Sequence, residues 1–222
     1  MNPNVLLLLI ATSIVLVIMI LFDFDKKLEK KEDHIIGKLI VIEGIEGSGK
    51  KKLIEMMKNQ MPIEWTYTKE PYLVVDDISS WTKENYQLDR ETHVESKILP
   101  LLQQNKVLIT NRYWMSGCVY DGWEMDSYLH VWPEPDLVIW LDIEPTEEIA
   151  EVTKVDLPIL QKCRESYKEL FHKLGAEHHI PIKRINTTGQ SEEAILEEAI
   201  QELEKHIPSL KNNVFLEEPL AA

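Results

Sequence analysis

The sequence predicts an α/β domain in which a doubly wound, parallel, five-stranded sheet is flanked by helices. Five short apolar runs alternate with segments of helical spacing, and this alternation is typical of successive β-α-β units. The first run leads straight into a glycine-rich turn. At 222 residues, the chain is long enough for one such domain with an appendage at either end.

The predicted strands are short runs in which apolar residues predominate. The first contains an unbroken apolar stretch, LIVI, which suits a strand that is buried on both faces of a parallel sheet. The five comprise residues 38–43 (KLIVIE), 64–68 (EWTYT), 106–110 (KVLIT), 137–142 (LVIWLD) and 180–186 (IPIKRIN).

Helical spacing predicts three of the intervening helices. Residues 90–104 and 157–174 form two of them, and Ser191 begins the last. Glu192 and Glu193 in its first turn suit the positive end of the helix dipole, and Pro208 ends it. Its apolar face consists of Leu196, Ala199, Ile200, Leu203 and Ile207.

The amino end differs in kind from the rest of the chain. Residues 5–22 (VLLLLIATSIVLVIMILF) carry no charge and are about as many as the shortest helices that cross a bilayer. This predicts a single-pass transmembrane helix. A cleaved signal peptide is the main alternative, but neither a basic segment before the run nor a small-residue cleavage site after it is found. A buried core helix is a weaker alternative because such helices are rarely apolar all round.

The flanks of this apolar run predict its orientation. Lys26, Lys27, Lys30 and Lys31 follow it, whereas MNPN precedes it. Since lysine-rich flanks favour the cytoplasmic side, we expect a membrane protein whose globular domain faces the cytoplasm. The predicted organisation is a transmembrane anchor (1–22), a charged linker (23–36), a globular domain (37–207) and a carboxyl-terminal tail (208–222).

The composition argues against two classes of function. The formal net charge is −14, and a broad grip on nucleic acid needs basic faces, so no nucleic-acid partner is expected. Cys118 and Cys163 lie far apart in the sequence and in no metal-ligand spacing. They indicate a reducing compartment without a disulfide framework.

A glycine-rich loop follows the first predicted strand. Its sequence GIEGSGKK fits the phosphate-binding pattern G-x-x-x-x-G-K, and it stands directly between a strand and a helical segment. Backbone N–H groups can converge there on phosphate oxygens, and Lys50 can reach a β- or γ-phosphate. An ordinary glycine-rich turn is the plain alternative. The sequence thus predicts a sheet of the P-loop NTPase type, with ATP phosphates held by Gly44, Ile45, Glu46, Gly47, Ser48, Gly49, Lys50 and Lys51.

One position of this loop departs from the pattern. Where a serine or threonine hydroxyl would ligate Mg²⁺ the chain has Lys51, and an ammonium group cannot ligate a cation. Ordinary metal placement is therefore in doubt. A second pattern, TKVD at 153–156, imitates the guanine-reading T-K-x-D of GTPases, but the preceding EEIAEV has helical character. We interpret that pattern as coincidence.

Three further stretches occur in a fixed order, TKEP (68–71), YQLDRETH (86–93) and NRYWMSGCVYDG (111–122). Together with EGIEGSGK (43–50) and PDLVIWLDIEP (135–145), they resemble thymidylate kinase, the P-loop enzyme that phosphorylates dTMP with ATP. The resemblance spans about residues 37–207. It implies ATP and a pyrimidine deoxynucleoside monophosphate as substrates and Mg²⁺ as cofactor. Members of this family commonly dimerise, so a homodimer is an expectation that rests on the resemblance alone.

The resemblance implies catalytic roles for Lys50, Glu46 and Arg112. Glu46 matches an acid near the metal and the sugar 3′-hydroxyl, and it is the one metal ligand implied. Arg112 matches an arginine that faces the transferred phosphoryl group, where positive charge stabilises the transition state. Lys69 stands where the family usually has an arginine that contacts phosphate, so a point charge replaces the bidentate fork.

The resemblance also implies a nucleoside pocket. Tyr86 matches an aromatic residue that stacks on thymine, Arg90 matches an arginine that donates to the pyrimidine edge, and Ser116 and Tyr120 match pocket-lining residues. Each has a plain structural alternative. The tyrosines would be core aromatics, Arg90 and Lys69 would be surface charges, and Ser116 would cap a helix.

Three elements aimed at the metal and the γ-phosphate are altered together. Besides Lys51, Asn111 replaces the aspartate of the family's third-strand motif, and TEEIAEVTKVD (146–156) is acidic where the family usually has a lid with arginines. We therefore expect a thymidylate kinase-like nucleoside monophosphate kinase and leave its turnover open. A membrane-anchored pseudokinase or scaffold of the same fold is one alternative, favoured by Lys51 and Asn111. A UMP/CMP-type kinase is another, because Tyr113 and Trp114 are similar to residues of such relatives.

Overall fold

The computed structural model describes residues 37–74, 78–129 and 131–210. The predicted anchor (1–22) and charged linker (23–36) lie outside these ranges, as do residues 211–222 of the predicted tail. Within the described ranges, no helix combines the length and the apolar character that crossing a membrane requires.

The described residues form a five-stranded sheet in the order β2-β3-β1-β4-β5, and all neighbouring strands are parallel. The predicted parallel sheet is therefore confirmed, with strand bounds that differ from the predicted ones by two residues or fewer. The strands are β1 (Lys38–Glu43), β2 (Thr66–Lys69), β3 (Val107–Asn111), β4 (Leu137–Asp142) and β5 (Ile182–Asn186).

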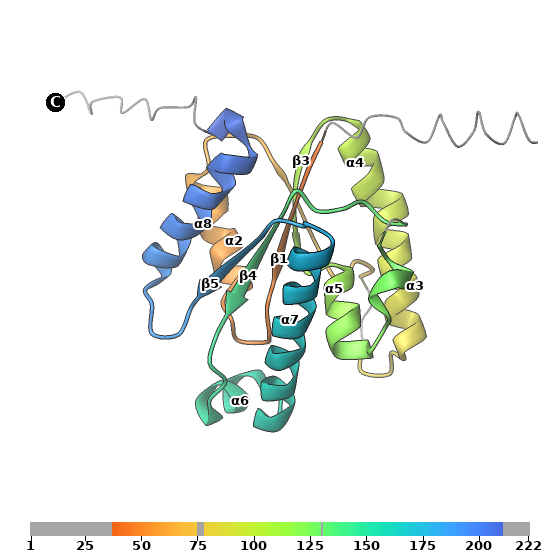
Figure 1. Cartoon of the computed structure of the whole chain (residues 1–222), viewed down its shortest axis with the longest axis vertical. Coiled ribbons are helices and arrows are strands. Elements are labelled where there is room, and N and C mark those ends of the chain that lie inside the picture. Colours follow the sequence, from red (N-terminus) through yellow and green to blue (C-terminus); the bar gives the residue numbers. More distant parts are fainter. Residues whose placement is uncertain (1–36, 75–77, 130, 211–222) are drawn as a thin grey trace, which may run out of the picture. The chain divides into compact units, whose positions relative to one another are not determined.

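Helices cover both faces of this sheet (Figure 1). The helices of seven residues or more are α2 (Lys50–Gln60), α3 (Lys83–His93), α6 (Glu147–Thr153), α7 (Leu157–Glu177) and α8 (Glu192–His206). Shorter helical pieces are η2 (Val94–Ile98), α4 (Leu99–Gln103), α5 (Trp114–Ser116), η3 (Gly117–Asp121), η4 (Met125–Ser127) and η5 (Pro208–Leu210).

The alternation of side chains along β1 explains why its four central residues are all apolar. Leu39 and Val41 belong to a core shared with η2, α4, α5 and α7, whereas Ile40 and Ile42 belong to a second core shared with α2 and α8. Successive side chains of a strand point to opposite faces, so a strand between two helical layers must be apolar at every position. β1 lies between β3 and β4 and satisfies this condition.

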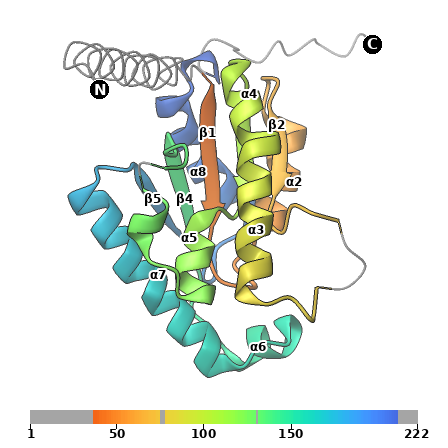
Figure 2. The same ribbon diagram turned by 90° about the vertical axis from the view of Figure 1, so that its right-hand side faces the viewer.

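The helix predicted over residues 90–104 begins seven residues earlier, at Lys83. Thr82 caps it, because its hydroxyl accepts a hydrogen bond from the Asn85 amide while the Asn85 side chain accepts one from the Thr82 amide. From α3 the chain continues through the π-helical turn η2 into α4 as one rod (Figure 2). The first turns escaped prediction because buried positions of α3 are polar, with Asp89 and His93 among them, and so lack apolar periodicity.

The segment with the GTPase-like pattern forms α6 and the turn after it. Thr146 caps this helix by accepting a hydrogen bond from the Ile149 amide, and Lys154 ends it in the left-handed conformation with φ 58°. The pattern therefore starts at the last residue of a helix and not after a strand, which supports its interpretation as coincidence. At the other end of the domain, η5 places Leu210 in the core beyond the predicted boundary at residue 207.

Candidate active site

Lys50 and Arg112, the two main cationic residues of the predicted site, follow the carboxyl ends of β1 and β3 and so lie at the same end of the sheet. The two strands pair in parallel, so the loop after β1 and the segment after β3 emerge side by side. The Arg112 amide donates to the Ile42 carbonyl at 3.0 Å, which ties the two exits together. Open parallel sheets bind ligands at this edge.

The glycine-rich loop adopts a backbone that other residues would resist. Gly47 and Gly49 have φ of 79° and 91°, in the left-handed region that favours glycine. Gly44 is closely packed as well, since a methyl group there would lie 2.4 Å from the Leu141 carbonyl oxygen. α2 begins directly after Gly49, so its first amides open toward the loop.

Lys50 points into this loop and is 6% exposed. Its Nζ donates to the carbonyl oxygens of Gly44 and Ile45 at 2.8 and 2.7 Å, and to the Ser48 hydroxyl at 3.3 Å. Burial and, to a smaller extent, the charge of Arg112 lower the pKa of Lys50 to about 7, against the opposing charges of Glu46 and Glu43. An anionic group at the loop would favour the ammonium form.

Helix α6 lies against the loop. A methyl group on Gly47 would come within 2.7 Å of Cγ2 of Ile149 and 3.3 Å of Cγ2 of Thr153. A hollow of about 360 Å³ borders this contact and is lined also by Thr188 and Gly189, which follow β5. The helix that covers the phosphate loop thus carries glutamates in its first turn and no arginine.

The two lysines after Lys50 are exposed. Lys51 is exposed in the first turn of α2, and Lys52 pairs with Glu192 of α8 at 3.1 Å. No acidic residue lies in that first turn, although cations at a helix start oppose its dipole by about 0.3 to 1 kcal/mol each. A bound polyanion would turn this cost into an attraction.

A cavity of about 290 Å³ opens beside Arg112. Its lining residues are Glu46, Glu70, Pro71, Ile78, Tyr86, Asp89, Arg90, Arg112, Ser116, Tyr120 and Asp121. The structure therefore brings together six of the predicted site residues, Glu46, Tyr86, Arg90, Arg112, Ser116 and Tyr120. Lys69 differs, because it is exposed at the end of β2 and does not line this cavity.

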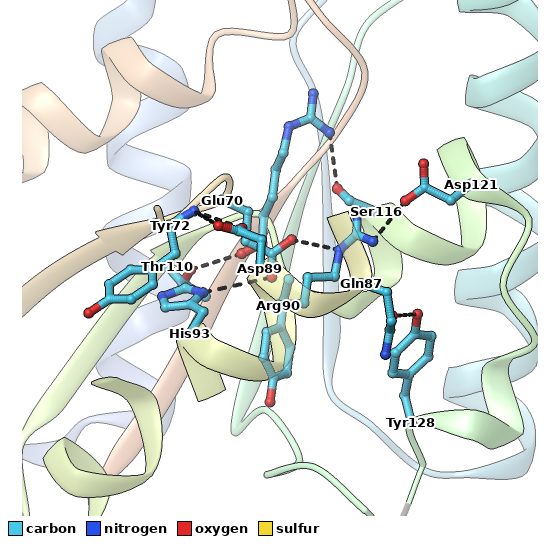
Figure 3. A network of polar contacts seen from close by, with 12 residues as sticks. Glu70, Tyr72, Gln87, Asp89, Arg90, His93, Thr110, Ser116, Asp121 and Tyr128 are labelled. Carbon is cyan, nitrogen blue, oxygen red and sulfur yellow. Dashed lines mark hydrogen bonds and ion pairs between the residues drawn. The ribbon is translucent and has the colours of Figure 1, made fainter. Parts of the chain in front are cut away.

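Arg90 belongs to a buried ion-pair network (Figure 3). Its Nε donates to Oε2 of Glu70 at 3.1 Å and its Nη1 donates to Oδ2 of Asp121 at 2.7 Å. The Tyr86 ring centre lies 6.0 Å from the guanidinium carbon. Arg90 is therefore no surface charge. Its two acidic partners line the same cavity, and sequence reasoning gave neither of them a role.

The rim of the cavity next to Arg90 is fixed by buried polar contacts, which Figure 3 also shows. The Asp89 carboxylate accepts hydrogen bonds from the amides of Tyr72 and Leu73 at 2.7 to 3.1 Å. His93 is fully buried, lies 2.6 Å from the Thr68 hydroxyl through Nε2 and stacks on Tyr72 at 4.7 Å. These contacts hold the segment after β2 against α3.

Arg112 is held in an unusual backbone conformation, with φ 72°. The Thr110 hydroxyl donates to its carbonyl at 2.8 Å. Its guanidinium contacts Glu46 through Nη2, and the guanidinium carbon lies 4.8 Å from the Tyr120 ring centre. Desolvation raises the pKa of Glu46, but the charges of Arg112 and Lys50 outweigh it, so that the Glu46 pKa lies below its usual value.

Two residues behind Arg112 were missed by sequence reasoning. Glu43, the last residue of β1, has no exposed surface and accepts hydrogen bonds from the Tyr113 amide at 2.9 Å and the Tyr167 hydroxyl at 2.8 Å. Desolvation raises the pKa of Glu43, against the opposing charge of Arg112. A charged residue that ends an otherwise apolar strand was the available signal for Glu43. Tyr167 gave no signal, since an aromatic residue in a helix usually means core.

The donor set does not fit a magnesium site built by protein side chains alone. In the part of the chain that the structure describes, no group of three or more His, Cys, Asp or Glu residues could hold a metal ion. Glu46 is paired with Arg112, and Lys51 offers an ammonium group where a hydroxyl is expected. Asn111 leaves a buried Oδ1 without a hydrogen-bond partner, but it is one neutral oxygen. Mg²⁺ prefers carboxylates and substrate phosphates.

The family model described as thymidylate kinase matches residues 79–199, which is more than half of the chain. The chain belongs to the thymidylate kinase family. The matched region includes α3, β3, β4 and α7, and with them Arg90, Arg112 and Tyr167.

Individual thymidylate kinases are similar over most of their length. The thymidylate kinase of Clostridium novyi (strain NT) is 27% identical over 194 residues, covering 68% of this chain and 90% of the relative. A probable thymidylate kinase of Pyrococcus horikoshii is 30% identical over 169 residues, covering 60% and 82%. A third, probable thymidylate kinase 1 of Saccharolobus solfataricus, is 27% identical over 194 residues, covering 77% and 98%. This chain is thus a divergent member of the family.

Proposed function

We propose that this protein transfers the γ-phosphoryl group of ATP to dTMP or a related pyrimidine nucleoside monophosphate. One observation carries this proposal: the glycine-rich loop and the cavity beside Arg112 lie next to each other at the carboxyl-terminal ends of the strands. The phosphate loop with Lys50 emerges from β1, and the cavity lined by Tyr86, Arg90 and Arg112 begins directly beside it. Family membership supports a nucleoside monophosphate kinase, and the cavity residues support the pyrimidine acceptor.

The ATP phosphates bind in the loop of residues 44–51. Amides of the loop and of the first turn of α2 donate to the phosphate oxygens, and Lys50 exchanges the carbonyl oxygens of Gly44 and Ile45 for a phosphate. A charge-assisted bond to a phosphate is stronger than a bond to a neutral carbonyl, which favours that exchange. Glu46 would be the side-chain ligand of the Mg²⁺ that is expected from the family, and substrate phosphates would have to supply the other ligands.

The acceptor binds in the cavity of about 290 Å³. Tyr86 stacks on the base, Arg90 donates to the pyrimidine edge, and Ser116 and Tyr120 line the nucleoside. Arg112 contacts the acceptor phosphate and stabilises the charge that develops during in-line transfer, while Glu46 lies beside the sugar. Lys69 is exposed at the end of β2 and does not line the cavity. It contacts the acceptor phosphate only if that phosphate extends out of the cavity.

An ADP-release assay on the full-length chain tests this proposal. ATP is supplied with dTMP, dUMP, dCMP or UMP, with Lys50→Ala as the matched inactive variant. We expect turnover with dTMP below the 1 to 100 s⁻¹ that is typical of kinases, because the acidic α6 offers no arginine to the phosphates. Nucleotide binding without turnover by any acceptor would identify a pseudokinase. Absence of binding to both ATP and dTMP would refute the proposal.

We further propose that residues 5–22 anchor the protein in a membrane with the domain on the cytoplasmic side. The uncharged run and the lysines that follow it support this. Extraction of membranes with alkaline carbonate should leave the protein in the pellet, and protease added to sealed right-side-out vesicles should spare the domain. A homodimer, expected from the family, would appear as twice the 25.9 kDa chain mass in sedimentation of the detergent-solubilised protein.

A further inference from the structure

A buried carboxylate stands behind Arg112, and two hydroxyl groups lie between the two charges. The Ser116 hydroxyl donates to Oε2 of Glu43 at 2.9 Å, and the Tyr167 hydroxyl donates to the same oxygen at 2.8 Å. On their other side, both hydroxyl oxygens accept from Nη1 of Arg112, at 3.0 Å for Ser116 and 3.5 Å for Tyr167. Each hydroxyl therefore uses both its donor and its acceptor capacity.

This arrangement gives the Arg112 guanidinium two distinct edges. Nη1 faces the hydroxyls and is anchored to the interior, whereas Nη2 contacts Glu46 and the Tyr120 hydroxyl beside the cavity. The Glu46 side chain is 49% exposed, so an arriving phosphate can replace it. The backbone of Arg112 is already fixed by the hydrogen bond that its amide donates to the Ile42 carbonyl. The two hydroxyls therefore determine how the Arg112 guanidinium is oriented.

We propose that Tyr167 and Glu43 are positioning residues, which aim the Nη2 edge of Arg112 at the phosphate of the bound monophosphate. This inference rests on the proposed function, because it needs an acceptor with a phosphate. Without the Tyr167 hydroxyl, Nη1 has one acceptor fewer and Glu43 one donor fewer. The guanidinium then turns toward the buried carboxylate, since opposite charges in a poorly solvated site attract strongly, and less positive charge is left for the phosphate.

The packing of Tyr167 allows its hydroxyl to be removed alone. The ring stacks on Phe171 at 5.4 Å and meets Tyr120 edge-on at 6.2 Å, and a phenylalanine would keep both contacts. Tyr128 offers a matched control, because it is equally buried and its hydroxyl donates to Gln87 at 2.6 Å instead of joining this network. Both substitutions remove one buried tyrosine hydroxyl.

The test compares dTMP with thymidine, which lacks the phosphate, by calorimetry on the full-length chain. We expect Tyr167→Phe to weaken dTMP binding about tenfold, as for one lost hydrogen bond to a charged group, and to leave thymidine binding unchanged. Tyr128→Phe should leave the ratio of the two affinities unchanged. In an Arg112→Ala background, Tyr167→Phe should have no effect on dTMP, because Tyr167 acts through Arg112.

Glu43→Gln is the second variant, which keeps the shape of the side chain and removes its charge. In this background Tyr167→Phe should weaken dTMP binding less than it does in the wild type, because no buried anion is left to draw the guanidinium inward. Equal weakening of both ligands by Tyr167→Phe would show a merely structural role and overturn the inference, as would an unchanged affinity for dTMP. A wild-type chain that binds dTMP no more tightly than thymidine would refute the proposed phosphate site itself, which is a separate outcome.

Discussion

Ile149 of α6 lies directly against Gly47 of the phosphate loop, so that a methyl group on that glycine would come within 2.7 Å of Cγ2 of Ile149. Helix α6, in the segment where the resemblance implies a lid with arginines, therefore packs directly on the loop. It contributes an apolar contact and an acidic first turn to the site. A triphosphate that binds in the loop therefore lies close to both the Ile149 side chain and the negative charges of Glu147 and Glu148.

Gly47→Ala should be more destabilising than Gly49→Ala. Both glycines have positive φ, which costs an L-residue about 1 to 2 kcal/mol, but only Gly47 also meets α6, whereas nothing lies within 4 Å of the methyl position at Gly49. Chemical denaturation of both variants measures the difference in free energy of unfolding. Equal losses would show that α6 does not press on the loop. ATP binding to Gly47→Ala should weaken too.

ATP binding at pH 8 should draw a proton onto Lys50. The pKa of this lysine is lowered to about 7, largely by burial, so much of it is neutral at pH 8, and the triphosphate favours the ammonium form. Calorimetry in buffers of different ionisation enthalpy measures the uptake. Lys50→Arg, whose side chain is always charged, should abolish it. Equal uptake by both proteins would assign the proton to another group.

The same shift predicts how stability depends on pH. The folded pKa of about 7 lies below the usual lysine value of 10.5, so the unfolded chain binds more protons between these limits. The contribution of Lys50 to the free energy of unfolding should therefore increase from pH 7 toward pH 10. Lys50→Met should flatten this increase in denaturation experiments, and an unaltered slope would contradict the assignment.

Lys51→Thr combined with Asn111→Asp should raise Mg²⁺-dependent ADP formation from ATP and dTMP. The first change restores a hydroxyl ligand after the loop lysine, and the second a carboxylate at the end of β3. Titration of the rate against Mg²⁺ concentration measures the effect. Lys52→Thr, which removes a neighbouring lysine paired with Glu192, is the control. Wild-type turnover already in the range of about 1 to 100 s⁻¹ would contradict our view of these positions.

Arg90→Leu should lower the free energy of unfolding by about 3 to 5 kcal/mol, because it leaves Glu70 and Asp121 buried without their cation. Thermal or chemical unfolding measures the loss. The exposed pair of Lys205 and Glu202 serves for comparison, and Lys205→Ala should change stability by no more than about 0.5 to 1 kcal/mol. Comparable effects of the two substitutions would mean that the Arg90 network is well solvated.

The parts of the fold that depend on local pattern were predictable from the sequence. KLIVIE and LVIWLD coincide with β1 and β4 because strands covered on both faces carry unbroken apolar runs, here LIVI and LVIWL. The beginning of α3 was not predictable from periodicity, since its inner face carries Asp89 and Arg90. Its signal lay in the cap at Thr82, where Asn85 takes the place of the more familiar glutamate.

The candidate site likewise has one part that could be predicted from the sequence and one part that could not. The loop from Gly44 to Lys50 is contiguous, and its place between a strand and a helix could be predicted from spacing. The partners of Arg112 and Arg90 come from distant segments of the chain. Tyr167, for example, contacts Arg112 and also donates to Glu43, which lies 124 positions earlier in the sequence. Such long-range pairs cannot be recognised in a single sequence. The one available signal was an acidic residue at the end of an apolar strand, here Glu43. Asp142, which ends β4 and is held by Arg164 and Arg184, shows the same signal without lining the cavity.

The charges that line the cavity have a consequence for how fast a nucleotide arrives. Four acids and two arginines surround it, in a chain of net charge −14, so the long-range field repels an anion that the local donors attract. Added salt screens the repulsion at a distance more than the contacts at close range. The association rate constant for dTMP should therefore rise with ionic strength, opposite to the behaviour of an enzyme that steers its substrate electrostatically.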